Sequence, residues 1–159
     1  MLREIFIQLN EWVDQENKEA TEEGRLSMSC AEIYIIGQSA LMEAGLSIDL
    51  AATADVDSKY QLEYKLRKKF DELLKADGKF LDPVGHEAWM PEETVYKQIF
   101  EGRHIVGYIA EPVFIILSKA KKAPIKNKQL IIDYLASSDL DHRLFELAKK
   151  YDVKFEDII

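Results

Sequence analysis

Short runs of β-branched and aromatic residues alternate with segments of helical spacing, and this alternation restricts the fold more than any other feature. The run IYIIG, from Ile33, ends in a glycine, which is typical of a buried strand followed by a tight turn. TVYKQIF and RHIVGYIA are separated by Glu101 and Gly102 and predict a hairpin. Another short strand is expected around residues 54–56. The 159 residues are enough for one domain with a substantial core.

Helical segments lie between and after these strands. Apolar residues recur at helical spacing in residues 2–13, and the polar residues 14–25 indicate a solvated connection or a frayed helix end. Pro112 begins a helix that Pro124 ends, and Gly78 ends an earlier one. The expected helices are 2–13, 39–45, 59–78, 111–123, 127–137 and 138–152.

The predicted fold class is α+β, with a small mixed β-sheet covered by helices and a helical C-terminal part. We expect a single domain over residues 1–159. It would comprise an N-terminal helix and linker (1–28), a sheet-containing core (29–110) and C-terminal helices (111–159).

Charge and composition exclude several classes of function. The net charge of −8 disfavours broad attraction to nucleic acid, so any contact with RNA would be local. No apolar run approaches a membrane span, and we therefore expect a cytoplasmic protein without a membrane partner. Cys30 is the only cysteine, which excludes an internal disulfide and a thiolate zinc site. Its expected role is that of a small buried side chain.

Two aspartates separated by one valine are the first candidate for chemistry. In an extended segment Asp55 and Asp57 would point to the same side while Val56 enters the core. Two nearby carboxylates repel each other unless a cation lies between them, and Mg²⁺ prefers such oxygen ligands. In a chain this rich in acids, ordinary solvated loop charges are the alternative.

Gly37 and Ser39 follow the first strand and begin a helix. Backbone N–H groups and a hydroxyl would then be exposed where a phosphate could approach. The alternative is a plain turn between strand and helix. A phosphate-binding turn followed by paired carboxylates is nevertheless the order needed to hold a nucleotide with its metal.

These motifs have a family resemblance. GQSALMEAG followed by TADVDS resembles the signature of the DNA polymerase β-like nucleotidyltransferase superfamily. FLDPVGHEAWMPEETVY, GYIAEPVFIILSKAKKA and KNKQLIIDYL are similar, in order and spacing, to later segments of small prokaryotic members related to abortive-infection and toxin-type nucleotidyltransferases. The resemblance extends from about Ile33 to Leu135.

The resemblance implies roles for individual residues. Asp55 and Asp57 would hold Mg²⁺, or Mn²⁺, and Gly37 and Ser39 would bind the triphosphate. Toxin-type relatives also use a lysine in the helix after the hairpin and an aspartate in the next helix. Lys119 matches that lysine, although a lysine at the edge of a core often only extends to water.

Asp133 is the best match to the aspartate of the toxin-type relatives, with Gln129 and Ile132 as alternatives. The third acid of the superfamily has no evident counterpart in the hairpin strands. Asp82 and Glu87 lie in the loop around Trp89, where they could reach the pocket or, more commonly, organise a turn.

The expected function is therefore that of a magnesium-dependent nucleotidyltransferase. It would move a nucleoside monophosphate from an NTP to a hydroxyl of RNA, protein or a small molecule. The alternative is a catalytically degenerate nucleotide-binding or toxin–antitoxin-type interaction module with a protein partner. A purely structural scaffold, in which the aspartates are incidental, is a third interpretation.

Overall fold

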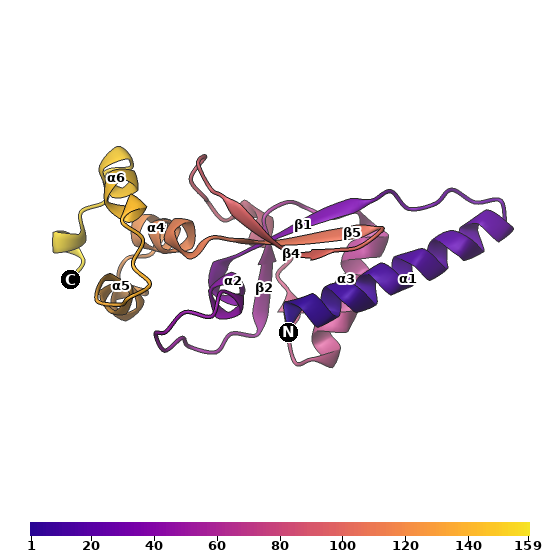
Figure 1. The fold of residues 1–159 in the computed structure, drawn as a ribbon, viewed down its shortest axis with the longest axis horizontal. Helices are drawn as coiled ribbons and strands as arrows, with labels where there is room; N and C mark the ends of the chain where they lie inside the picture. The colour runs from indigo at the N-terminus through magenta and orange to yellow at the C-terminus, as the bar shows by residue number, and fades with distance from the viewer.

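The computed structural model describes residues 1–159 and contains a five-stranded mixed sheet with six α-helices (Figure 1). The strands are β1 (Ala31–Ile36), β2 (Asp55–Ser58), β3 (Phe80–Leu81), β4 (Tyr96–Glu101) and β5 (Ile105–Ala110). The helices are α1 (Leu2–Glu22), α2 (Gly37–Glu43), α3 (Tyr64–Ala76), α4 (Pro112–Lys122), α5 (Lys128–Leu135) and α6 (Arg143–Lys150). The predicted α+β class with a mixed sheet is confirmed.

The strand order is β3-β2-β1-β5-β4, with β1 at the centre. β1 pairs antiparallel with β2 and parallel with β5, while β3 pairs parallel with β2. β4 and β5 form the predicted antiparallel hairpin. The central position of β1 explains its apolar sequence, because Ile33, Ile35 and Ile36 are all buried.

α1 and α3 pack against one face of the sheet (Figure 1). Phe6 of α1 stacks on Phe70 of α3 with 5.8 Å between ring centroids. The same ring lies against Gly107 of β5, where an added Cβ would come within 2.4 Å of it. α2 lies beside the start of α1, and the backbone N–H of Leu2 donates to Glu43 at 2.7 Å.

The three C-terminal helices lie beyond one end of the sheet (Figure 1). Ser118 of α4 donates to the carbonyl oxygen of Trp89 at 2.5 Å, which fixes the long loop before β4 against this helix. The backbone N–H and hydroxyl of Ser47 both donate to Asp139. These bonds join the helical part to the segments that precede β4 and β2.

α1 is longer than predicted. Residues 14–22 continue the helix instead of forming a connection. Buried Ala20 and the ion pair between Lys18 and Asp14, at 3.0 Å and one helical turn apart, account for the continuation.

Other expectations also need correction. α6 begins at Arg143 and not at Ser138, because the preceding residues form turns around Asp141, which accepts a hydrogen bond from the N–H of Arg143. β3 was not predicted because only two residues pair. Cys30 is exposed, since it precedes β1. No helix is both long enough and apolar enough to cross a membrane.

Candidate functional site

Asp55 and Asp57 lie on the same side of β2, as the alternation predicted. Both are half-buried, whereas Val56 and Ser58 between and after them are buried. The parallel pairing of β2 with β3 brings a third acid beside them, because the N–H of Asp82 donates to the carbonyl oxygen of Val56 at 2.9 Å. Asp55, Asp57 and Asp82 each place a carboxylate oxygen within 4.8 Å of the others. We call these three residues the acid cluster.

Two glycines enclose the carboxylate of Asp57. A Cβ at Gly37, which has a φ of 72°, would lie 2.6 Å from Oδ2 of Asp57. A Cβ at Gly85 would lie 2.7 Å from Oδ1. Oδ1 is buried and has no hydrogen-bond partner. Gly37 thus makes room for a carboxylate, and the carboxylate retains an oxygen that can take a proton or a cation.

The acid cluster is electrostatically unfavourable as it stands. Burial, followed by the neighbouring charges of Asp55 and Asp82, raises the pKa of Asp57 to about 6. Lys119 acts in the opposite direction and lowers the pKa of this carboxyl. A group whose ionised form is disfavoured by burial and like charge is one that a bound cation would stabilise.

Asp55 is held in position by its neighbours. The hydroxyl of Thr53 donates to the carboxylate of Asp55. Lys79 donates to the carbonyl oxygen of Thr53 at 2.9 Å, which fixes the segment before β2. The backbone of Asp55 accepts a hydrogen bond from Oγ of Ser39 at 2.8 Å. Asp55 is therefore oriented by both its side chain and its backbone.

Ser39 does not occupy the position expected of a triphosphate ligand. It is buried, it lies outside the cavity in front of the acid cluster, and its hydroxyl hydrogen is used on the backbone of Asp55. In the structure, Ser39 joins α2 to β2. Gly37, in contrast, lines the cavity.

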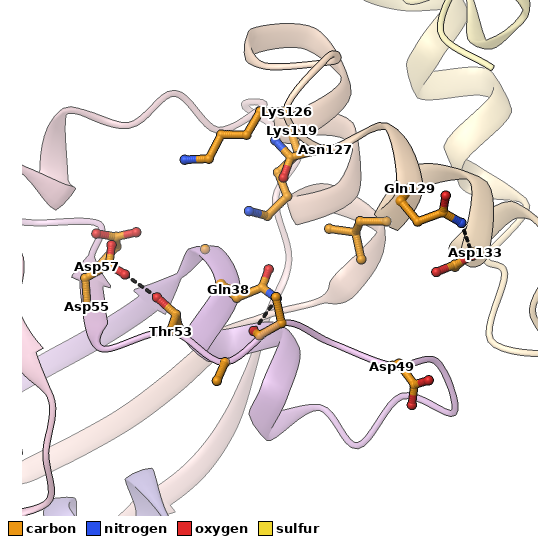
Figure 2. A pocket seen from close by; sticks show the side chains of 14 residues that line it. Gln38, Asp49, Thr53, Asp55, Asp57, Lys119, Lys126, Asn127, Gln129 and Asp133 are labelled. Atoms are coloured by element: carbon orange, nitrogen blue, oxygen red, sulfur yellow. Dashed lines mark hydrogen bonds between the residues drawn. The ribbon is translucent and has the colours of Figure 1, made fainter.

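A polar cavity of about 510 Å³ separates the acid cluster from the C-terminal helices (Figure 2). Only three of its fourteen lining residues are hydrophobic. The lining consists of Gly37, Gln38, Asp49, Ala51, Ala52, Thr53, Asp55, Asp57, Lys119, Lys126, Asn127, Gln129, Leu130 and Asp133. The volume falls in the range of small-ligand sites, and the lining suits a charged ligand better than an apolar one.

Two lysines face the aspartates across this cavity. The side chains of Lys119, on α4, and Lys126, in the following turn, extend toward Asp55 and Asp57 (Figure 2). Burial and the charge of Lys126 lower the pKa of Lys119, while Asp57 and Asp55 raise it. An anion placed between the lysines and a cation-loaded acid cluster would be attracted from both sides.

Asp133 lines the same cavity but lies apart from the acid cluster. It accepts a hydrogen bond from Gln129 at 2.8 Å, and this pair is on the α5 side (Figure 2). Ile132, the other alternative considered from sequence, is not among the lining residues. The structure thus brings together Asp55, Asp57, Lys119 and Asp133 around one cavity.

Sequence reasoning named Asp82 only as a loop acid that could reach the pocket, and it missed Thr53. Asp82 also organises a turn, as expected, since its Oδ1 accepts from the N–H of Val84 at 3.0 Å. Its membership of the acid cluster depends on β3, for which the apolar pair Phe80–Leu81 is the only local signal. For Thr53, the sequence indicates only that a hydroxyl lies two residues before Asp55, which is weak evidence of a contact between them.

Comparison of the chain with protein-family models, with curated proteins and with solved structures finds no match in any of the three. The geometry of the cavity therefore carries the functional interpretation.

Replacing Gly37 with alanine is expected to destabilise the protein through Asp57. The φ of 72° alone costs about 1 kcal/mol for a residue with a Cβ. The contact with Oδ2 of Asp57 should add about 1–2 kcal/mol, because Gly85 blocks the other side of the carboxylate. Gly45→Ala is the control, since Gly45 has a φ of 69° and no atom near its missing Cβ. Urea denaturation would contradict this explanation if both variants lost the same stability.

The raised pKa of Asp57 predicts a pH dependence for the metal-free protein. The folded state binds a proton with a pKa of about 6, whereas the carboxyl of the unfolded chain has an ordinary pKa of 3.8. The stability contribution of this group is therefore present at low pH and is lost as the pH rises through this window. We expect a loss of about 1–2 kcal/mol from Asp57 after allowance for solvent screening. Denaturation in EDTA of the wild type and of Asp57→Asn, at each pH, isolates the contribution of Asp57. A difference in stability between the two proteins that does not change with pH would contradict the prediction.

Proposed function

We propose that this protein is a metal-dependent nucleotidyltransferase that moves a nucleoside monophosphate from an NTP to a hydroxyl acceptor and releases pyrophosphate. One observation carries the proposal. Asp55 and Asp57 of the acid cluster line one wall of a cavity whose opposite wall presents Lys119 and Lys126. A triphosphate accompanied by a divalent cation has the charge distribution that these two walls would attract.

The acid cluster fits a hard divalent cation. Its donors are carboxylate oxygens only, which Mg²⁺ and Mn²⁺ prefer, and no histidine or cysteine lines the cavity to favour a softer metal. The unpartnered Oδ1 of Asp57 supplies a free ligand atom. Asp55, Asp57 and Asp82 would hold the ion. When bound, the ion would neutralise phosphate oxygens and stabilise charge that develops on the attacking and leaving oxygens.

The remaining groups of the site would handle the substrate. Lys119 and Lys126 would neutralise phosphate charge from the side opposite the acid cluster. The pair of Gln129 and Asp133, at the α5 side of the cavity, would contact the nucleoside.

A nucleotide-binding module without turnover is the second candidate, and one observation favours it. Ser39 is buried against Asp55, so the first turn of α2 offers the cavity no side-chain hydroxyl for a triphosphate. A protein that binds NTP and metal through the acid cluster but does not react them would retain this geometry.

Thermal denaturation with each NTP, with and without Mg²⁺, tests the proposed site. We expect stabilisation that requires both components, since a ligand that binds only the folded state raises its stability. No shift with any combination would contradict the proposal. Incubation with labelled NTP and total RNA or protein then separates the two candidates, because only an enzyme transfers the label.

Thr53→Val is expected to weaken divalent-metal binding without unfolding the protein. Valine has nearly the shape of threonine but cannot donate to the carboxylate of Asp55. Loss of a bond that orients a ligand typically costs about 10-fold or more in metal affinity. Titration with Mn²⁺ measures this affinity, and Thr53→Ser, which keeps the hydroxyl, is the control. Equal affinity in wild type and Thr53→Val would show that Thr53 does not orient Asp55.

A further inference from the structure

The second face of the sheet carries a group of tyrosines that the nucleotide site does not use. Ile33 and Ile35 of β1 are buried toward α1 and α3, so Tyr34 between them points to the opposite face. Tyr108 of β5 is the register partner of Tyr34 and therefore lies on that face too. The C-terminal helices lie beyond the end of the sheet and not over β1 and β5 (Figure 1).

Four tyrosines form one cluster there. Tyr34 is at its centre and stacks on Tyr108 with 4.6 Å between centroids and an angle of 6°. The rings of Tyr96 and Tyr60 meet Tyr34 edge-on, at 4.9 and 5.5 Å. Tyr60 remains 57% exposed, so at least one ring offers its surface to solvent. We call this group the tyrosine face.

Two acids border the tyrosine face. Val106 of β5 is the register partner of Glu32 in β1 and of Glu101 in β4. The side chains of Glu32, Val106 and Glu101 therefore form a row across the sheet, beside the tyrosines. Both glutamates are exposed, and neither forms an ion pair. Glu32 accepts a hydrogen bond from the hydroxyl of Tyr34 at 2.5 Å. Lys59, next to Tyr60 in the sequence, donates to the carbonyl oxygen of Ala88 at 3.1 Å.

This combination of groups selects a cationic occupant. Nucleic acid would bring phosphates toward Glu32 and Glu101, and the same face of a second copy would oppose acids to acids. A guanidinium group fits both features, because it stacks on aromatic rings and donates two parallel hydrogen bonds to a carboxylate. We propose that the tyrosine face and its two glutamates bind an arginine-containing segment of another protein. This binding is independent of the nucleotide site.

Isothermal titration with short synthetic peptides tests the proposal on the full chain. The probes alternate serine with arginine, with lysine or with glutamate. We expect the arginine peptide to bind most tightly, the lysine peptide more weakly and the glutamate peptide not at all. Glu32→Gln combined with Glu101→Gln should weaken binding of the arginine peptide at least about 10-fold, and Tyr60→Ala should weaken it several-fold.

Matched variants separate this surface from general attraction to an acidic protein. Glu146→Gln combined with Glu156→Gln makes the same charge change at exposed, unpaired acids near the C-terminus and should leave binding unchanged. Equal weakening by both double variants, or no binding of the arginine peptide, would overturn the proposal. So would single-stranded RNA that binds wild type but not Tyr60→Ala, or a dimer that forms through this face. Thermal denaturation of each variant verifies that it is folded.

Discussion

Asp57→Asn is expected to eliminate the joint stabilisation by Mg²⁺ and NTP while it stabilises the metal-free protein. Asparagine fits the space between Gly37 and Gly85 but lacks the charge that a cation requires. Loss of a central ligand should reduce metal affinity by more than about 100-fold, beyond the effect of losing an orienting bond. In the metal-free protein, the substitution removes a buried charge that repels Asp55 and Asp82. That change should add about 1–2 kcal/mol of stability at neutral pH, after allowance for screening.

These opposite changes distinguish a metal site from a structural acid. Mn²⁺ titration gives the metal affinity, and urea denaturation in EDTA gives the stability of the metal-free protein. Asp49→Asn is the matched control, because Asp49 lines the same cavity but is exposed and lies outside the acid cluster. If Asp57→Asn kept the metal response, or if Asp49→Asn lost it to the same extent, the acid cluster would not be the metal site.

Local patterns predicted the parts of the site that depend on local geometry. The placement of Asp55 and Asp57 follows from alternation along one strand, and it therefore required only the correct secondary structure. Lys119 was chosen because it matches a lysine of the toxin-type relatives. The hairpin was predicted for the same reason, since β4 and β5 are adjacent in the sequence.

The remaining contributors depend on contacts between segments that are distant in sequence. Asp82 reaches the acid cluster only because the two residues of β3 pair with β2, and so short a pairing has almost no sequence signal. The orientation of Ser39 depends on how α2 packs against β2. The two-residue spacing of Gly37 and Ser39 does not determine which of their groups faces a ligand. α1 extends past the prediction because buried Ala20 anchors an otherwise polar segment.

Lys119→Met is expected to weaken NTP binding while leaving metal binding intact. Lys119 is a half-buried cation on the wall opposite the aspartates, and its charge lowers the pKa of Asp57. Removing one charge-assisted contact to phosphate should reduce NTP affinity about 10- to 100-fold. Binding of Mn²⁺ alone should be unchanged or tighter, because a positive charge that competes with the ion is gone. Stability should not fall, since burial already disfavours the charged amine, as the lowered pKa of Lys119 shows.

Lys128→Met provides the control for this substitution. Lys128 is the first residue of α5 and follows Asn127, which lines the cavity. Lys128 itself is exposed and does not line the cavity. Removing its charge should change NTP affinity by less than about 2-fold at physiological salt, where exposed charges are screened. Titration with a fluorescent NTP analogue in the presence of Mg²⁺ measures both variants. Equal effects of the two substitutions would mean that Lys119 only extends from the core to water, and that the wall opposite the acid cluster does not select a triphosphate.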